Sequence, residues 1–212
     1  MRIDILTLFP DMFSALEHSI IKRACAAGKL KINLVNFREF AGNKHNQVDD
    51  KSFSGGAGMV IRAPAVVDCV EHIDPGHDAW RIFMTPAAAV LTQEKVMELS
   101  KKDRLIILCG HYEGVDQRAI DLCFDEVISI GDYVLTGGEI PAMVLVDAVS
   151  RHVEGVINAE SLKNESFSDG KNLEHPQYTR PRVFRGLGVP EVLLNGNHAE
   201  IEKWKQANSG KK

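Results

Sequence analysis

Hydrophobic residues recur along residues 1–155 in two alternating patterns, short apolar runs and amphipathic stretches. The apolar runs are RIDILTL, LKINLVNF, RIFMTP, RLIILCG and EVISIG, and each reads as a buried strand. Between them, apolar residues repeat at helical spacing, as in Phe13, Leu16 and Ile20. Apolar strands that alternate with helices predict an α/β fold with a parallel sheet covered on both faces.

Start and stop signals mark the expected helices. Asp11 suits the start of the first helix and Gly28 its end, Pro64 and Pro141 each open a helix, and Thr92 suits an N-cap. A short helix is expected in DQRAIDLCF. Residues 38–58 are polar and rich in glycine, which predicts a long loop.

The pattern changes after residue 155. Residues 156–176 are polar with few apolar anchors, which indicates a linker or a mobile loop. The segment GVPEVLLNGNHAEIEKWKQ then offers one apolar cluster and one amphipathic helix, too little for a separate core. We expect a main domain at 1–155, a flexible linker or lid at 156–172 and a small helical domain at 173–212.

Charge is unevenly distributed over the 212 residues. The net charge is −4, but residues 171–212 carry eight Lys/Arg against four acids, so this end is basic and the rest acidic. The split permits a polyanion partner, although a solvated basic tail explains it equally well. The chain lacks an apolar run of the roughly 18 residues that span a bilayer and opens on a strand-like segment, so we expect a cytoplasmic protein.

Cysteine and histidine give no sign of a metal site. The four cysteines, Cys25, Cys69, Cys109 and Cys123, form no CxxC pair and have apolar neighbours, which predicts buried reduced thiols. The eight histidines are scattered without the spacing of metal ligands.

Three unusual loops follow strands three, four and five: TPAAAVL, CGHYEGVDQR and IGDYVLTGGEIP. Ligands of an open parallel sheet collect at the carboxyl ends of its strands, and glycine lets the main chain approach a ligand closely. The loops therefore predict one pocket, with tight strand-to-helix turns as the alternative.

The candidate chemistry is proton removal rather than nucleophilic attack. The chain has no G-x-x-x-x-G-K-[ST] loop and no G-x-S-x-G elbow. Candidate side chains are the cation Arg151 and the carboxylates Glu113, Asp132, Glu139, Glu165 and Asp169. A carboxylate base with a cation suits proton removal when a cofactor carries the bond-making step, although Glu165 and Asp169 also fit a solvated loop.

Five ordered blocks carry a family resemblance over nearly the whole chain: LFPDMF, DDKSFSGGAGMV, CGHYEGVDQR, IGDYVLTGGEIPAMVLVDAVSR and HPQYTRPRVFRGLGVPEVLLNGNHAEIEKWK. The chain resembles the bacterial tRNA (guanine-N1)-methyltransferases, the TrmD family of the SPOUT class. The resemblance implies a mostly parallel sheet with a deep trefoil knot, whose loops bind S-adenosylmethionine. It further implies an obligate homodimer with active sites at the subunit interface and a tRNA-binding C-terminal domain.

The implied reaction is methyl transfer to N1 of guanosine-37 in tRNA, assisted by magnesium without an assigned ligand. By position, the cofactor contacts would be Pro86, Gly110, Glu113, Ile130, Gly131, Asp132, Tyr133, Val134, Leu135, Gly137 and Gly138. Arg151 matches the arginine that offsets charge at guanine O6. Glu165 occupies the position of the family's aspartate base, with Asp169 as the alternative.

The chain departs from the family pattern at three places. Ala87 and Ala88 stand where Gln-Gly is usual, and His111 where arginine is usual, which removes a permanent charge from the rim of the site. The end NSGKK comes where relatives often continue with basic residues, so we expect fewer phosphate contacts. Two alternatives stay open: a SPOUT enzyme acting on ribosomal RNA or another tRNA site, and an RNA-binding protein without turnover.

Overall fold

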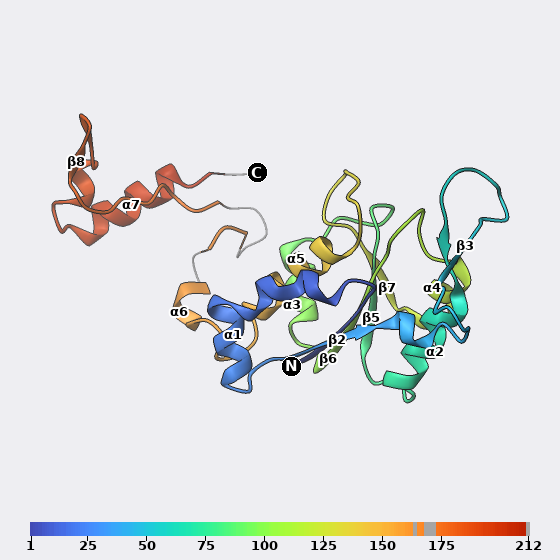
Figure 1. Cartoon of the computed structure of the whole chain (residues 1–212). Helices are drawn as coiled ribbons and strands as arrows, with labels where there is room; N and C mark the ends of the chain where they lie inside the picture. The colour runs from blue at the N-terminus through green and yellow to red at the C-terminus, as the bar shows by residue number, and fades with distance from the viewer. Residues whose placement is uncertain (163–164, 168–172, 211–212) are drawn as a thin grey trace. The chain divides into compact units, whose positions relative to one another are not determined.

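The computed structural model describes residues 1–162, 165–167 and 173–210. The chain divides into two compact units, Met1–Ile157 and Asn158–Lys212 (Figure 1). Each unit is built differently, the first around a sheet and the second around short helices and a hairpin.

A five-stranded sheet forms the centre of the first unit. Its strands are β1 (Arg2–Thr7), β2 (Lys31–Asn36), β5 (Trp80–Met84), β6 (Arg104–Cys109) and β7 (Glu126–Ile128). The order across the sheet is β2-β1-β6-β5-β7, and every neighbouring pair is parallel. The predicted α/β fold with a parallel sheet is confirmed.

Helices cover both faces of this sheet. One face packs against η1 (Pro10–Glu17), α1 (Ser19–Ala26), α3 (Gln93–Leu99) and α5 (Glu139–Ser150). The other face packs against η2 (Phe37–Phe40), α2 (Ala63–Ile73) and α4 (Gln117–Cys123). Two hydrophobic clusters result, one on each side of the strands.

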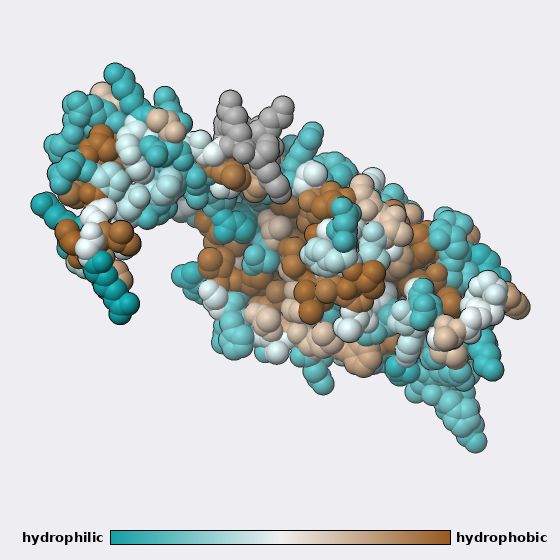
Figure 2. Space-filling view, turned by 90° about the horizontal axis from the view of Figure 1, so that it is seen from above, coloured by the Kyte–Doolittle hydropathy of each residue, from teal (hydrophilic) through white to brown (hydrophobic). Residues whose placement is uncertain are grey.

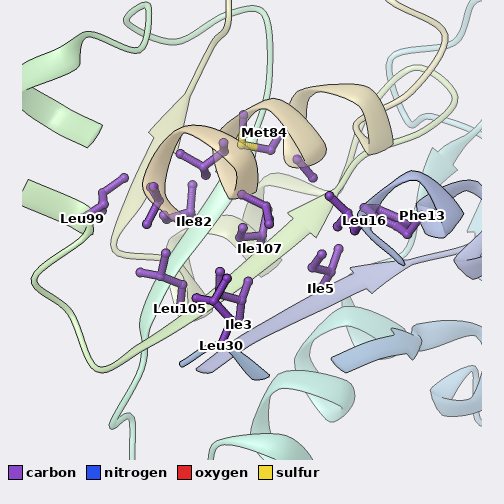
Figure 3. Close-up of a cluster of buried hydrophobic side chains, with 14 of the residues drawn as sticks. Ile3, Ile5, Phe13, Leu16, Leu30, Ile82, Met84, Leu99, Leu105 and Ile107 are labelled. Atoms are coloured by element: carbon purple, nitrogen blue, oxygen red, sulfur yellow. The ribbon is translucent and has the colours of Figure 1, made fainter. Parts of the chain in front are cut away.

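Alternate residues of each strand enter opposite clusters, because side chains of a strand alternate between its faces. On the face shown in Figure 3, strand residues such as Ile82 and Ile107 lie between Leu99 of α3 and Phe13 of η1. Their neighbours Phe83 and Leu108 belong to the other cluster. Burial on both faces explains why the strands read as continuous apolar runs.

Three local expectations were wrong. The helix expected from Asp11 is interrupted at His18, which is extended, and Ser19 has a φ of 52°, so a 3-10 helix precedes α1. The expected loop at 38–58 contains η2 and one strand of the pair β3 (Asp49–Asp50) and β4 (Val60–Ile61). Helix α5 begins before Pro141, which its first turn tolerates because the N–H groups there lack intrahelical partners.

A buried charge network lies near the amino-terminal ends of the strands. Asp74 accepts hydrogen bonds from Arg81 Nε at 2.9 Å and Arg104 Nη1 at 3.0 Å. Arg104 also bonds Asp4 at 2.8 Å, and Asp4 and Asp74 are each 1% exposed. Burial opposes ionisation of Asp74, but Arg81 and two backbone amides outweigh it and hold its pKa below the ordinary value.

The cysteines lie where the sequence predicts, with one exception. Cys69, Cys109 and Cys123 are buried, Cys25 is half-buried, and all four are free thiols. Burial, with the nearby carboxylates of Glu39 and Asp4, raises the pKa of Cys69 to about 12. Within the described ranges, none of the helices has the length and apolar character needed to cross a membrane.

The second unit contains α6 (Ala159–Leu162), β8 (Val183–Phe184), β9 (Leu187–Gly188), η3 (Glu191–Leu193) and α7 (His198–Asn208). The predicted amphipathic helix is confirmed as α7, whereas the β8–β9 hairpin was not anticipated. Rings of His175 and Tyr178 contact Trp204, with centroids 5.9 and 6.1 Å away. No described side chain of this unit is fully buried, as expected for a segment with few apolar anchors.

Candidate functional site

Three loops at the carboxyl ends of β6, β5 and β7 enclose a cavity of about 360 Å³. They are the same three loops that the sequence singled out. The strands are neighbours in the sheet although β6 separates β5 from β7 in the chain, and because all three are parallel, their loops meet at one edge. The position is the one where parallel sheets bind ligands.

Main-chain hydrogen bonds hold the three loops together. Ser129 N donates to Ala89 O at 3.0 Å, and Leu91 N donates to Ser129 O at 2.8 Å, which joins the loops after β5 and β7. Gly138 N donates to Gly110 O at 2.8 Å, which joins the loops after β7 and β6. The walls of the cavity are therefore one connected structure rather than three separate turns.

Glycine is required where the loops touch. A Cβ on Gly138 would lie 2.7 Å from both Cys109 Cα and Gly110 N, which are main-chain atoms. A Cβ on Gly137 would collide with the side chains of His111 and Glu139. The glycine pair thus lets the start of α5 pack directly on the end of β6.

A polar chain runs from the cavity into the protein through Glu139, the first residue of α5. Glu139 is 1% exposed and accepts a hydrogen bond from Thr7 Oγ1 at 2.8 Å. Its other oxygen shares a hydrogen bond of 2.8 Å with Nε2 of His111, and the His111 ring contacts Phe9. Glu139 therefore links three segments and fixes the orientation of His111 on the cavity wall.

Glu113 connects the cavity to the loop between β3 and β4. Its N–H donates to Met59 O at 2.9 Å, and its side chain lies against Gly58. Its carboxylate is on the cavity lining, which provides a partner for a cationic group of a ligand.

The structure places ten of the eleven expected cofactor contacts on the cavity wall. They are Pro86, Gly110, Glu113, Ile130, Gly131, Tyr133, Val134, Leu135, Gly137 and Gly138. Asp132 belongs to the same loop but is exposed and lies outside the lining. Ala87 lines the cavity at the family's glutamine position, and its neighbour Ala88 does not.

Several lining residues were missed by sequence reasoning. They are the strand-end residues Phe83, Met84 and Ile128, together with Ser129, which lie just before the loops that the sequence singled out. The strand ends read as core, and the cavity reaches them because glycine leaves Gly110 without a side chain beside Phe83. Tyr112 belongs to the predicted loop CGHYEGVDQR, lines the cavity and adopts a φ of 58°.

The expected catalytic residues lie elsewhere. Arg151 caps the carboxyl end of α5, whereas Gly138, at the amino end of that helix, lines the cavity. A helix of twelve residues spans roughly 18 Å at 1.5 Å per residue, so Arg151 is remote from the cavity of its own chain. Glu165 is half-buried in the second unit, and Asp169 lies outside the described residues.

The cavity suits a flat ligand with a cationic group. Its lining is rich in main chain and in apolar side chains, including Leu135 and Ile130, which pack well on the faces of a ring system. Main-chain N–H and C=O groups can bond the edge of such a ring. In the part of the chain that is described, no group of three or more His, Cys, Asp or Glu residues forms a metal site.

Comparison with known proteins agrees with these features. The family model for tRNA (Guanine-1)-methyltransferase TrmD matches residues 1–212. A tRNA (guanine-N(1)-)-methyltransferase of Staphylococcus aureus (strain MRSA252) is 53% identical over 207 residues, covering 97% of this chain and 84% of the relative. The corresponding protein of Staphylococcus aureus (strain JH9) is 52% identical over 207 residues, which again cover 97% of this chain and 84% of the relative.

Proposed function

The chain belongs to the tRNA (guanine-1)-methyltransferase family, and from that premise we propose that it methylates N1 of guanosine-37 in tRNA. S-adenosylmethionine supplies the methyl group. The observation that carries the proposal is the convergence of ten expected cofactor contacts, from three separate loops, on one cavity. The protein would act in the cytoplasm.

The cavity fits S-adenosylmethionine in size and chemistry. Glycines at 137 and 138 bring main chain to the lining, where N–H and C=O groups would read the adenine edge. Ile130 and Leu135 would pack on the faces of the adenine ring. The Glu113 carboxylate would hold the positively charged methionine end of the cofactor.

Proton removal is the chemical task of the side chains. Guanine N1 carries a proton at neutral pH, so a base must take it before N1 can accept a methyl group. Glu165 would be that base, with Asp169 as the alternative. Arg151 would offset the negative charge that develops at O6 when the proton leaves.

A homodimer reconciles these roles with the position of Arg151. Because Arg151 lies at the far end of α5 from the cavity, each cavity would receive it from the second copy of the chain. Helix α5 is apolar on almost every face, and Ile140 and Val144 stay exposed although most of its other apolar side chains are buried. Such a helix is normally covered on all sides, which supports a partner chain on this face.

The exposed apolar surface extends beyond α5. Phe9 and Met12, in and next to the neighbouring η1, are 42% and 43% exposed. Hydrophobic surface gathers across the middle of the first unit in Figure 2. A contiguous apolar area of this kind marks an interaction site, and a second copy would bury it.

The path of the chain supports a trefoil knot. After edge strand β7 the chain returns to the interior strand β6, where Gly138 packs on Cys109 and Gly110. The segment between β7 and α5 thus passes close to the loop between β6 and α4. In a trefoil knot, the chain would thread through that loop. Residues 173–212, which hold most of the basic segment 171–212, would bind the tRNA after the linker 156–172.

Magnesium would assist the reaction, with no ligand for it assigned in this chain.

Methyl-label transfer tests the proposed function. Label from S-adenosylmethionine should enter tRNA with guanosine at position 37 and should not enter the same tRNA with adenosine there. Equal labelling of both would favour another tRNA site. Cofactor binding without labelling, in the presence of magnesium, would favour an RNA-binding protein without turnover.

Mixed dimers test the sharing of active sites. Arg151→Ala and Gly138→Ala should each be nearly inactive as homodimers. After the two variants are unfolded and refolded together, one site of each mixed dimer has an intact cavity and an intact arginine, so activity should return. No recovery would show that Arg151 serves the cavity of its own chain.

A further inference from the structure

Phe53 lies at the tip of the loop between β3 and β4, with its side chain completely exposed. Its exposed fraction is 104%, the highest of the large apolar residues described. The residues that follow it, 54–58, are exposed as well. Aromatic side chains have large flat faces that gain energy from contact with another ring, so such a tip is suited to a ligand outside the chain.

The loop is attached at its base to the wall of the cavity. Strands β3 and β4 pair Asp49 with Ile61 and Asp50 with Val60. Ile61 N donates to Gly114 O at 2.9 Å, next to the bond from Glu113 N to the loop. The loop that carries Phe53 therefore starts at the rim of the site that would hold the cofactor and the target guanine.

Glycine conformation shapes the loop. Gly55, Gly56 and Gly58 have φ values of 77°, 94° and 92°, which other residues seldom adopt. A Cβ on Gly58 would lie 2.5 Å from the Glu113 side chain, so this end of the loop packs directly on the cavity lining. The loop is thus anchored on the cavity lining at one end and exposes the aromatic ring of Phe53 at its tip.

The substrate of the proposed reaction presents unpaired bases at this rim. N1 lies on the edge of guanine that pairs in a duplex, so the methylated guanine must be unpaired. Guanosine-37 lies next to the anticodon, so its neighbours belong to a single-stranded loop. Bases of single strands are recognised by stacking on aromatic side chains. Lys51, also exposed, lies two residues before Phe53 and can meet a phosphate of the same strand.

We propose that Phe53 stacks on an unpaired base of the tRNA next to the guanine that is methylated. The inference rests on the proposed function and extends it from the reacting base to its neighbour. Phe53 is a binding residue in this account and takes no part in proton or methyl transfer.

A double-mutant cycle between protein and RNA tests the contact. The proteins are wild type and Phe53→Ala, and the RNAs are anticodon stem-loops with each nucleotide beside the target guanosine either intact or abasic. Phe53→Ala should weaken binding of the intact RNA roughly ten- to hundred-fold, the range of one base stack. Removing the stacked base from the RNA should weaken binding to the wild-type protein by a similar factor. It should cause almost no further loss of affinity for Phe53→Ala.

Matched variants separate stacking from other effects. Phe53→Tyr and Phe53→Trp should keep affinity for RNA because they keep a flat ring, whereas Phe53→Leu should lose it. Ser54→Ala, the adjacent exposed position, should bind RNA as wild type does. S-adenosylmethionine should bind all of these proteins equally.

Three results would overturn the proposal: additive losses at both flanking nucleotides, full affinity in Phe53→Leu, or dissociation of a dimer by Phe53→Ala. The last would mean that a second copy of the chain covers Phe53. The proposed function is judged separately, by methyl transfer from wild type to the intact stem-loop, since the cycle measures binding alone.

Discussion

Replacing Gly138 by alanine is the sharpest perturbation of the cofactor cavity. The added Cβ would lie 2.7 Å from Cys109 Cα and Gly110 N, whereas carbon atoms in contact are about 3.5–4.0 Å apart. The two main chains must therefore separate by about 1 Å. Cys109 belongs to β6, which is held between β1 and β5, so the movement falls on the start of α5 and the glycine loop.

The cost follows from the contacts that this movement breaks. Overpacking of a tight interior costs about 1–3 kcal/mol, and the hydrogen bond from Gly138 N to Gly110 O contributes about 1 kcal/mol. Alanine recovers up to about 1 kcal/mol by restricting the unfolded chain, which leaves a net loss of roughly 1–4 kcal/mol. A displacement of about 1 Å in a cofactor site also costs on the order of 100-fold in turnover.

Thermal unfolding, calorimetric titration with S-adenosylmethionine and methyl transfer to tRNA measure the three effects. Gly188→Ala is the control for thermal unfolding and cofactor binding, because a Cβ there meets no described atom within 4 Å. Gly138→Ala should melt several degrees lower, bind the cofactor at least about tenfold more weakly and turn over slowly. A normal melting temperature with normal cofactor affinity would refute the idea that these main chains are in rigid contact.

Three further predictions concern stability, thiol reactivity and assembly. Asp74→Asn should destabilise the protein by roughly 3–5 kcal/mol at neutral pH by leaving Arg81 buried without its partner. Folding lowers the pKa of Asp74, so the stability that its carboxylate contributes is present above the ordinary pKa of 3.8 and is lost as pH falls through the pKa of the folded state. In urea unfolding, the difference in stability between wild type and Asp74→Asn should therefore shrink in acid. Cys69 and Cys109, whose pKa values are raised by burial, should resist iodoacetamide at neutral pH in the native protein, and mass spectrometry showing rapid labelling would contradict this. Ile140→Lys should convert the proposed dimer to monomers in sedimentation analysis and abolish methyl transfer while each chain stays folded by circular dichroism.

Local physical rules were sufficient for much of the fold. Strands that are apolar on both sides and alternate with helices are typical of a covered parallel sheet, so RLIILCG identified β6 without tertiary information. Unusual loops after three strands, two of them rich in glycine, identified the cavity, since carboxyl ends of parallel strands share one edge. The break at His18 was not predictable, because the positive φ of Ser19 is unusual for serine and the local sequence gives no sign of it.

Long-range geometry supplied the rest. In the sequence, β6 lies between β5 and β7. Only the folded sheet brings the loops after β5 and β7 together, through the hydrogen bonds that Ser129 makes with Ala89 and Leu91. The buried bond between Thr7 and Glu139 joins residues 132 positions apart, which no local pattern records. Residue identity thus set which segments become strands, helices and glycine turns, since those preferences are local. Strand order and the direction of α5 decided which loops meet and that Arg151 lies at the far end of α5 from its own cavity, because both arise from packing across the whole core.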